Sequence, residues 1–120
     1  MVTGVSAGSS VITYTNSNGC SITATVTVFA LPSITGTLTV CSGSTTQLTG
    51  SGTPAASNPW VSSNTAAATV SNTGLVTGVS AGSSVITYTN SNGCSITATV
   101  TVYASPSISG TLAVCIGLTT

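Results

Sequence analysis

The chain has no Asp, Glu, Lys, Arg or His among its 120 residues. Proton-transfer catalysis draws on His, carboxylates, Lys, Tyr or Cys, and here the Tyr and Cys residues have no charged neighbour to tune them. A serine nucleophile would have no base beside it. Phosphates would meet no Arg or Lys, and a calcium ion would meet no carboxylate. We therefore expect no enzyme, no nucleic-acid partner, no cofactor and no metal site.

Long apolar runs are absent as well. No stretch approaches 18 apolar residues, because Thr, Ser or Gly interrupts every few positions, so the sequence predicts no membrane span. A net charge of zero also removes the repulsion that keeps most proteins apart in solution. We expect the chain to associate with copies of itself, or to be solubilised by groups attached to it.

Ser and Thr are abundant, at 46 of the 120 residues, and Val and Ile recur between them. Alternation of β-branched apolar residues with Ser or Thr is typical of half-buried strands, and helical spacing is absent. We expect seven strands, at residues 32–41, 45–49, 60–63, 67–71, 75–79, 84–89 and 94–102. Short strands at this regular spacing predict an all-β fold, an antiparallel β-sandwich. Its expected core is Trp60, Leu48, Val70, Ile86, Tyr88, Ile96 and Val100.

The sequence repeats with an offset of 74 residues. Residues 2–28 recur without change at 76–102, and residues 1–46 match 75–120 at 39 of 46 positions. We expect residues 1–30 to be the C-terminal part of one repeat, 31–103 a complete repeat, and 104–120 the N-terminal strand region of the next. The stretch 47–74 has no second copy, so the two partial repeats cannot complete each other. Their open strand edges would recruit strands of other copies in a head-to-tail polymer, or the chain is part of a longer covalent tandem array.

One stretch of the complete repeat carries a family resemblance. It runs Trp60-Val61-Ser62-Ser63-Asn64, then Ala67-Ala68-Thr69-Val70, then Gly74-Leu75-Val76-Thr77, and closes with Thr99-Val100-Thr101-Val102. This pattern resembles the group 2 bacterial immunoglobulin-like domain, found in tandem repeats of large secreted surface and adhesin-type proteins. The resemblance implies an immunoglobulin-like β-sandwich, an extracellular or cell-surface location, and no catalytic residues.

The four cysteines occupy two positions per repeat, one shared by Cys20 and Cys94 and the other by Cys41 and Cys115. Zinc sites use closely spaced pairs, whereas the shortest gap here is 21 positions. Small secreted β domains are commonly disulfide-bonded, so we expect disulfides. In an immunoglobulin-like sandwich the two positions would lie at opposite poles, which favours a bond between adjacent repeats. A Cys41–Cys94 bond within one domain is the alternative.

These observations favour a structural component of an extracellular bacterial fibre, stalk or sheath built from tandem domains, with strand addition between subunits as one means of assembly. The alternative is an adhesin repeat or carbohydrate-binding module whose loops, residues 51–59 and 90–93, contact a glycan. The 90–93 loop repeats unchanged at 16–19, which favours a spacer. The outward Ser and Thr rows either form bare hydroxyl ladders or carry O-linked glycans.

Overall fold

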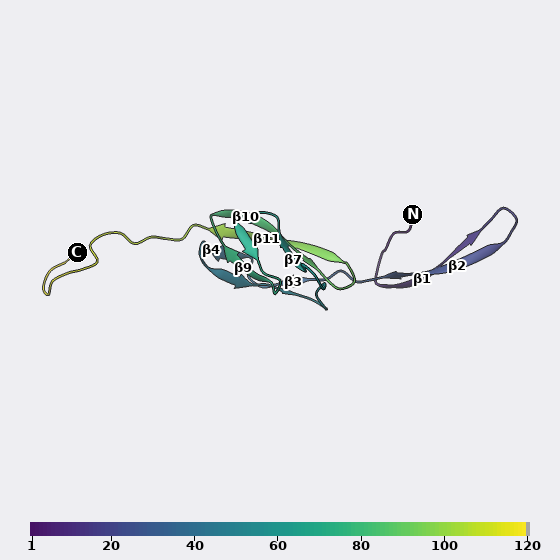
Figure 1. Ribbon diagram of the computed structural model, residues 1–120, viewed down its shortest axis with the longest axis horizontal. Helices are drawn as coiled ribbons and strands as arrows, with labels where there is room; N and C mark the ends of the chain where they lie inside the picture. Colours follow the sequence, from purple (N-terminus) through teal and green to yellow (C-terminus); the bar gives the residue numbers. More distant parts are fainter. Residues whose placement is uncertain (120) are drawn as a thin grey trace.

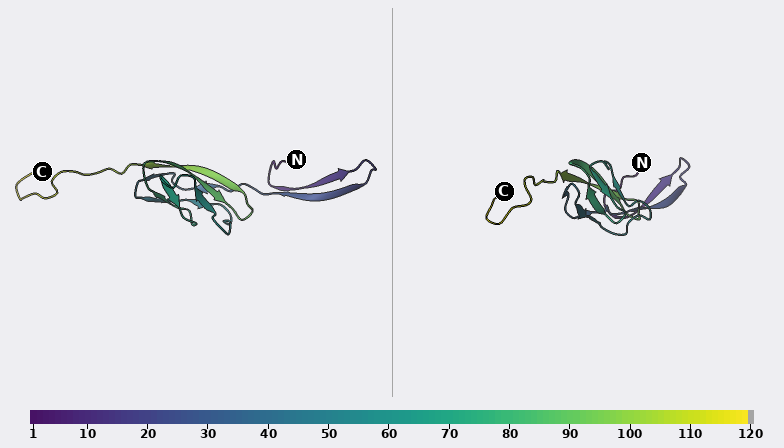
Figure 2. Two further views of the ribbon diagram at one scale, coloured as in Figure 1. Left: turned by 45° about the horizontal axis from the view of Figure 1, so that its top comes forward. Right: turned by 60° about the vertical axis from the view of Figure 1, so that its left-hand side comes forward.

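The computed structural model describes residues 1–119, and over these residues it contains strands β1 to β11 and no helix. The chain forms three consecutive parts: an N-terminal hairpin, a sandwich domain, and an extended C-terminal segment (Figure 1). The parts follow one another along a single axis, giving a particle of 100 × 22 × 21 Å. The two further views keep the hairpin and the C-terminal segment at opposite ends of the domain (Figure 2).

One layer of the sandwich is a four-stranded sheet in the order β4-β11-β10-β7. Its strands are β4 (Thr39–Cys41), β7 (Trp60–Ser62), β10 (Gly82–Thr89) and β11 (Ser95–Tyr103). The β10–β11 and β10–β7 pairs are antiparallel, whereas β4 runs parallel to β11. The long β10–β11 hairpin therefore has a short strand along each of its outer edges.

The second layer consists of a three-stranded sheet in the order β5-β9-β8 and a two-stranded sheet of β3 and β6. Its strands are β3 (Ile34–Thr35), β5 (Thr45–Gln47), β6 (Thr49–Gly50), β8 (Ala68–Val70) and β9 (Leu75–Gly78). All pairs in this layer are antiparallel. This arrangement confirms the predicted all-β, antiparallel sandwich.

The core lies between the two layers. The buried cluster is Val40, Leu48, Trp60, Ala68, Val76, Ile86, Tyr88, Val100 and Val102. Five of the seven expected core residues belong to it, while Val70 and Ile96 are partly buried and pack against it. The expected alternation therefore describes which face of each strand points inward, but the ends of the sandwich leave some inward side chains partly open.

Two of the expected strands are each divided in two. The stretch 32–41 separates into β3 and β4 at Gly36, whose φ of 125° lies in a region that favours glycine. The stretch 45–49 separates into β5 and β6 at Leu48, whose side chain is fully buried and whose N–H donates to the carbonyl of Gly74 at 2.9 Å. Each half pairs with a different sheet: β3 and β4 lie in different layers, whereas β5 and β6 both lie in the second layer.

Tyr88 has the most specific packing in the core. Its ring lies 4.7 Å from the Trp60 ring, centroid to centroid, with the planes tilted by 40°. Its hydroxyl donates to the carbonyl of Ser51 at 3.0 Å. Gly50 lies against the ring so closely that an added Cβ would stand 2.4 Å from ring carbons. Tyr88 is therefore held by three contacts: with the Trp60 ring, the Ser51 carbonyl and the Gly50 backbone.

Hydroxyl and amide groups satisfy the polar atoms that the sandwich buries. The buried Ser84 hydroxyl shares a 2.7 Å hydrogen bond with the Ser62 hydroxyl and accepts the Asn64 N–H at 3.0 Å. Within the described residues, no buried side-chain nitrogen or oxygen lacks a hydrogen-bond partner. The domain therefore closes its core without a charged group.

Replacing Trp60 with Ala should lower the free energy of unfolding by about 3–5 kcal/mol, because it empties a large aromatic site and removes the ring against Tyr88. Denaturant or thermal unfolding measures this change. Val61→Ala is the matched control, since Val61 follows on the same strand and is 51% exposed. Equal, small effects of both substitutions would contradict the core role of Trp60.

Replacing Gly50 with Ala should destabilise the domain by about 1–3 kcal/mol, the usual cost of overpacking a core. The reason is steric, because the new methyl would displace the Tyr88 ring. Thr49→Ala serves as the control at the exposed neighbour on the same strand. An unchanged unfolding midpoint for Gly50→Ala would show that the close contact between Gly50 and the Tyr88 ring does not contribute to stability.

Candidate assembly surface

The N-terminal hairpin is a second copy of the β10–β11 hairpin. It consists of β1 (Gly8–Thr15) and β2 (Ser21–Val28), whose sequence and pairing register repeat those of β10 and β11. The turns match as well: Asn16 Oδ1 accepts the N–H groups of Asn18 and Cys20 at 3.0 Å each. Asn90 Oδ1 makes the same two bonds in the second copy. Local interactions thus build the same hairpin twice.

The two hairpins differ in what covers their apolar face. Tyr14 is 67% exposed, whereas its equivalent Tyr88 is fully buried. Ile12 and Ile22 are exposed in the same way, and their equivalents are buried or partly buried. Burying each such side chain is worth about 1.5–3 kcal/mol, and an isolated two-stranded hairpin is at best marginally stable in water. This face therefore gains stability from any partner that covers it.

Both edges of the N-terminal hairpin are also unpaired. In the domain, β7 occupies the edge of β10 at residues 86–88, and β4 occupies the edge of β11 at residues 101–103. The equivalent backbone, residues 12–14 and 27–29, pairs with no strand other than its own hairpin partner among the described residues. Strand edges of this kind accept further strands.

The C-terminal segment repeats the sequence of β4, the strand that pairs with the edge of β11, but it forms no strand itself. Residues 113–115 are the repeat equivalent of β4, but residues 104–119 contain no strand. Val114 is 56% exposed, whereas its equivalent Val40 in β4 is 7% exposed. Leu112 and Ile116 are also exposed. The chain thus has an uncovered hairpin at one end and, at the other, a stretch equivalent to β4 at residues 113–115 that forms no strand.

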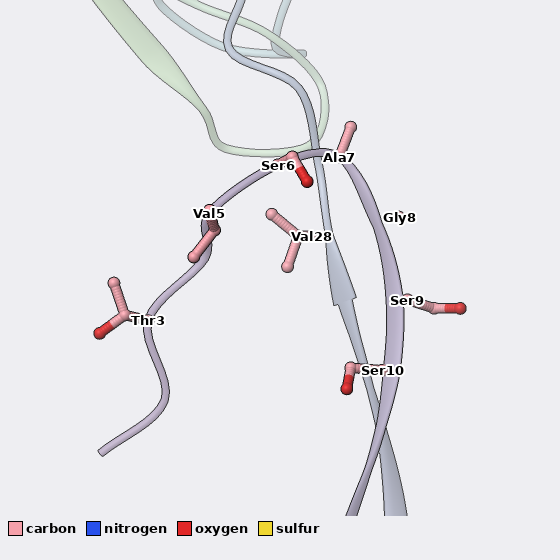
Figure 3. Close-up of a pocket in the computed structure, with 8 residues that line it drawn as sticks. All are labelled: Thr3, Val5, Ser6, Ala7, Gly8, Ser9, Ser10 and Val28. Carbon is pink, nitrogen blue, oxygen red and sulfur yellow. The ribbon is translucent and has the colours of Figure 1, made fainter.

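A hollow lies at the base of the N-terminal hairpin, where the chain before β1 passes beside β2 (Figure 3). The side chain of Val28 lies near its centre, between Val5 and Ser10. In the domain, the equivalent Val102 is 2% exposed. Residues 2–4 repeat the sequence of β9 residues 76–78 but form no strand here. The hollow is lined by Ser, Thr, Val, Ala and Gly residues, which carry no group for acid–base or metal chemistry.

The register places the two cysteine positions of a repeat at opposite poles. Cys41 is level with Tyr103 at the C-terminal end of β11, and Cys94 immediately precedes β11. Residues 94 to 103 of a strand span about 30 Å, whereas a disulfide needs Cα atoms within about 7 Å. The alternative Cys41–Cys94 bond within one domain is incompatible with this register. All four cysteines, Cys20, Cys41, Cys94 and Cys115, are free thiols in this structure.

The loops that would serve a binding module contact each other at the N-terminal pole. The N–H of Ser91 donates to the carbonyl of Thr53 at 2.8 Å, and Pro54 and Asn90 form an isolated bridge. The hairpin turn at residues 90–93 lies at the end of the domain where residues 29–33 arrive from the N-terminal hairpin (Figure 1). These loops therefore face the junction with the N-terminal hairpin.

The described residues hold no group of three or more His, Cys, Asp or Glu side chains placed to bind a metal ion. Among the same residues there is no helix of the length and apolarity needed to span a membrane. The surface features of residues 1–119 include the apolar hairpin face, its open edges, the exposed C-terminal segment and the cysteines at the poles.

Comparisons with known proteins agree with the fold. A search of curated proteins gave no match. The family model described as bacterial Ig-like domain (group 2) matches residues 32–102, which are the residues that build the sandwich. Since this match covers more than half of the 120 residues, the chain belongs to the group 2 family of bacterial immunoglobulin-like domains.

Proposed function

We propose that the chain is a structural segment of an extracellular bacterial fibre, stalk or sheath, in which immunoglobulin-like repeats follow one another end to end. Domains of this family typically serve as structural or adhesive modules of bacterial surface proteins. The observation that carries the proposal is the β1–β2 hairpin. It has the sequence and register of β10–β11, yet it lacks every strand that covers β10–β11.

The complete domain indicates what covers this hairpin. Strand β4 pairs in parallel with β11 through Thr39, Val40 and Cys41, and residues 113–115 repeat that strand almost unchanged. Residues 113–115 of one copy are therefore the matching partner for residues 27–29 of the next copy. Such a contact is heterologous, because two different surfaces meet, and it propagates along a line instead of closing into a dimer.

Charge does not oppose this association. The chain has a formal net charge of zero, so electrostatic repulsion between copies is absent. The loops at residues 51–59 and 90–93 face the junction between repeats, where a neighbouring repeat would cover them. Their position favours a spacer over a module that presents loops to a glycan.

The 120-residue chain should therefore form particles larger than its 11.5 kDa monomer at micromolar concentration. Light scattering measures the mass, and negative-stain microscopy should show linear particles. A stable, monodisperse 11.5 kDa species would contradict the proposal.

Changes on the bare hairpin face should weaken this association without unfolding the domain. Tyr14→Ser together with Ile22→Ser removes two exposed apolar side chains that form one cross-strand pair. The mean particle mass should fall severalfold. The control is Thr13→Ser together with Thr23→Ser, the adjacent cross-strand pair on the opposite face. An equal fall for both variants would mean that the apolar face is not the contact.

A further inference from the structure

We propose that successive repeats are joined by a disulfide between the Cys41 position of one repeat and the Cys94 position of the repeat that follows it. This inference rests on the proposed end-to-end arrangement and names the covalent link within it. Its starting point is the strand register, which puts Cys41 at the C-terminal pole of the domain and Cys94 at the N-terminal pole. Each pole faces a neighbouring repeat.

At the C-terminal pole, the chain that leaves the domain folds over the residue beside Cys41. The N–H of Ser42 donates to the carbonyl of Tyr103 at 2.8 Å. Two residues further along, the Ser105 hydroxyl donates to the carbonyl of Ser42. Position 105 of the linker is thus held next to the exposed Cys41.

At the N-terminal pole, the chain that enters the domain passes beside the turn that carries Cys94. The N–H of Ser33 donates to the Ser51 hydroxyl at 2.8 Å, and the N–H of Ser51 donates to the carbonyl of Ser33 at 2.9 Å. The loop that continues from Ser51 bonds the 90–93 turn, and Asn90 N–H donates to the carbonyl of Cys94 at 2.9 Å. Position 33 therefore lies at the level of the Cys94 turn.

The 74-residue period relates the position of residue 105 at one pole to the position of residue 33 at the other. Position 33 of one repeat is position 107 when counted from the repeat before it. Position 105 contacts the Cys41 end of the first repeat, and position 107 lies at the Cys94 end of the second. Two residues of extended chain span about 7 Å, so the Cys41 pole of one repeat and the Cys94 pole of the next lie next to each other. The short linker thus keeps the two cysteine positions on facing poles, as a disulfide between adjacent repeats requires.

Pairing the Cys41 position of one repeat with the Cys94 position of the next gives every cysteine a partner when copies of this chain stand head to tail. Cys41 of one copy bonds Cys20 of the next copy, because Cys20 is the Cys94 position of the repeat that follows the first domain. Cys115 of the first copy bonds Cys94 of the next copy by the same rule, at a junction where Leu31 takes the place of Ser105 and Ser33 keeps its bonds to Ser51. Every pair then joins two copies, and only the two end copies of an assembly keep free thiols.

Bond formation is an oxidation, and the oxidant we name is a small-molecule disulfide. One cysteine thiolate attacks a sulfur of that disulfide, forming a mixed disulfide and releasing one thiol. The second cysteine thiolate then attacks the protein sulfur and releases the other thiol. Two cysteine protons and two electrons thus pass to the oxidant, which leaves as two thiols.

The test is to oxidise the 120-residue chain at micromolar concentration with oxidised glutathione, alkylate the remaining thiols and run a non-reducing gel. We expect a ladder of multimers that reduction collapses to one band. Chymotryptic mapping should find peptides that link Cys41 to Cys20 and Cys115 to Cys94, since trypsin has no Lys or Arg to cleave. Mixing ¹⁵N-labelled with unlabelled chain should give mixed-isotope linked peptides, because each bond joins two copies.

Two double variants, each lacking two cysteines, give opposite expectations. Cys20→Ser with Cys41→Ser removes one complete pair, so the Cys115–Cys94 link should still give a ladder. Cys41→Ser with Cys94→Ser removes one member of each pair, so only monomer should remain. None of these cysteines is fully buried, so both variants should keep the thermal unfolding midpoint of the domain.

Equal ladders from the two variants, a Cys41–Cys94 peptide, or thiols that stay free under oxidation would overturn the disulfide assignment. Light scattering of the reduced chain separates this failure from failure of the proposed function. If the reduced chain assembles but yields no linked peptides, the fibre proposal stands and the disulfide falls. If it neither assembles nor cross-links, both fall.

Discussion

The structure depends on the covering of one hairpin. Strands β10 and β11 run the length of the sandwich and contribute Ile86, Tyr88, Val100 and Val102 to the core. They stay in the fold because β7 and β4 pair with their edges and the second layer closes over their inner face. The same hairpin at the N-terminus has none of these partners. Under the proposed function, covering this face would both stabilise a repeat and attach it to a neighbour.

The absence of charge determines which interactions can cover the apolar face of the hairpin. No salt bridge can orient two copies, so apolar burial and backbone pairing are left to supply the contact. Polar atoms that the fold buries are satisfied by hydroxyls and amides, as Ser84 shows through its bonds to Ser62 and Asn64. Backbone pairing of strand edges is directional, so it can fix the register of a neighbour where charge cannot. A charge-free surface and open edges thus favour ordered, strand-mediated association.

Much of this fold could be predicted from local pattern. Alternation marked Trp60, Leu48 and Tyr88 as inward residues, and all three are buried. The division of the first two expected strands could not be predicted, because it depends on which sheet each half joins. Gly36 permits the positive φ at one division, but other glycines of the chain share that conformation without dividing a strand. The sheet that each half joins determines whether a strand divides, and the sequence alone does not identify that sheet.

The assembly surface was visible in the sequence only as a repeat that lacks residues 47–74. The structure adds the direction in which the chain enters and leaves the domain. Because β4 is parallel to β11, Cys41 and the departing chain share one pole, while Cys94 and the arriving chain share the other. In the proposed fibre, the segment that leaves a domain bonds Ser42 through Ser105 and the segment that enters a domain bonds Ser51 through Ser33, so consecutive poles would stay close together. In the proposed fibre, each repeat would receive the chain at one end and pass it on at the other, so covering strands and cysteines would recur in a fixed order along a line.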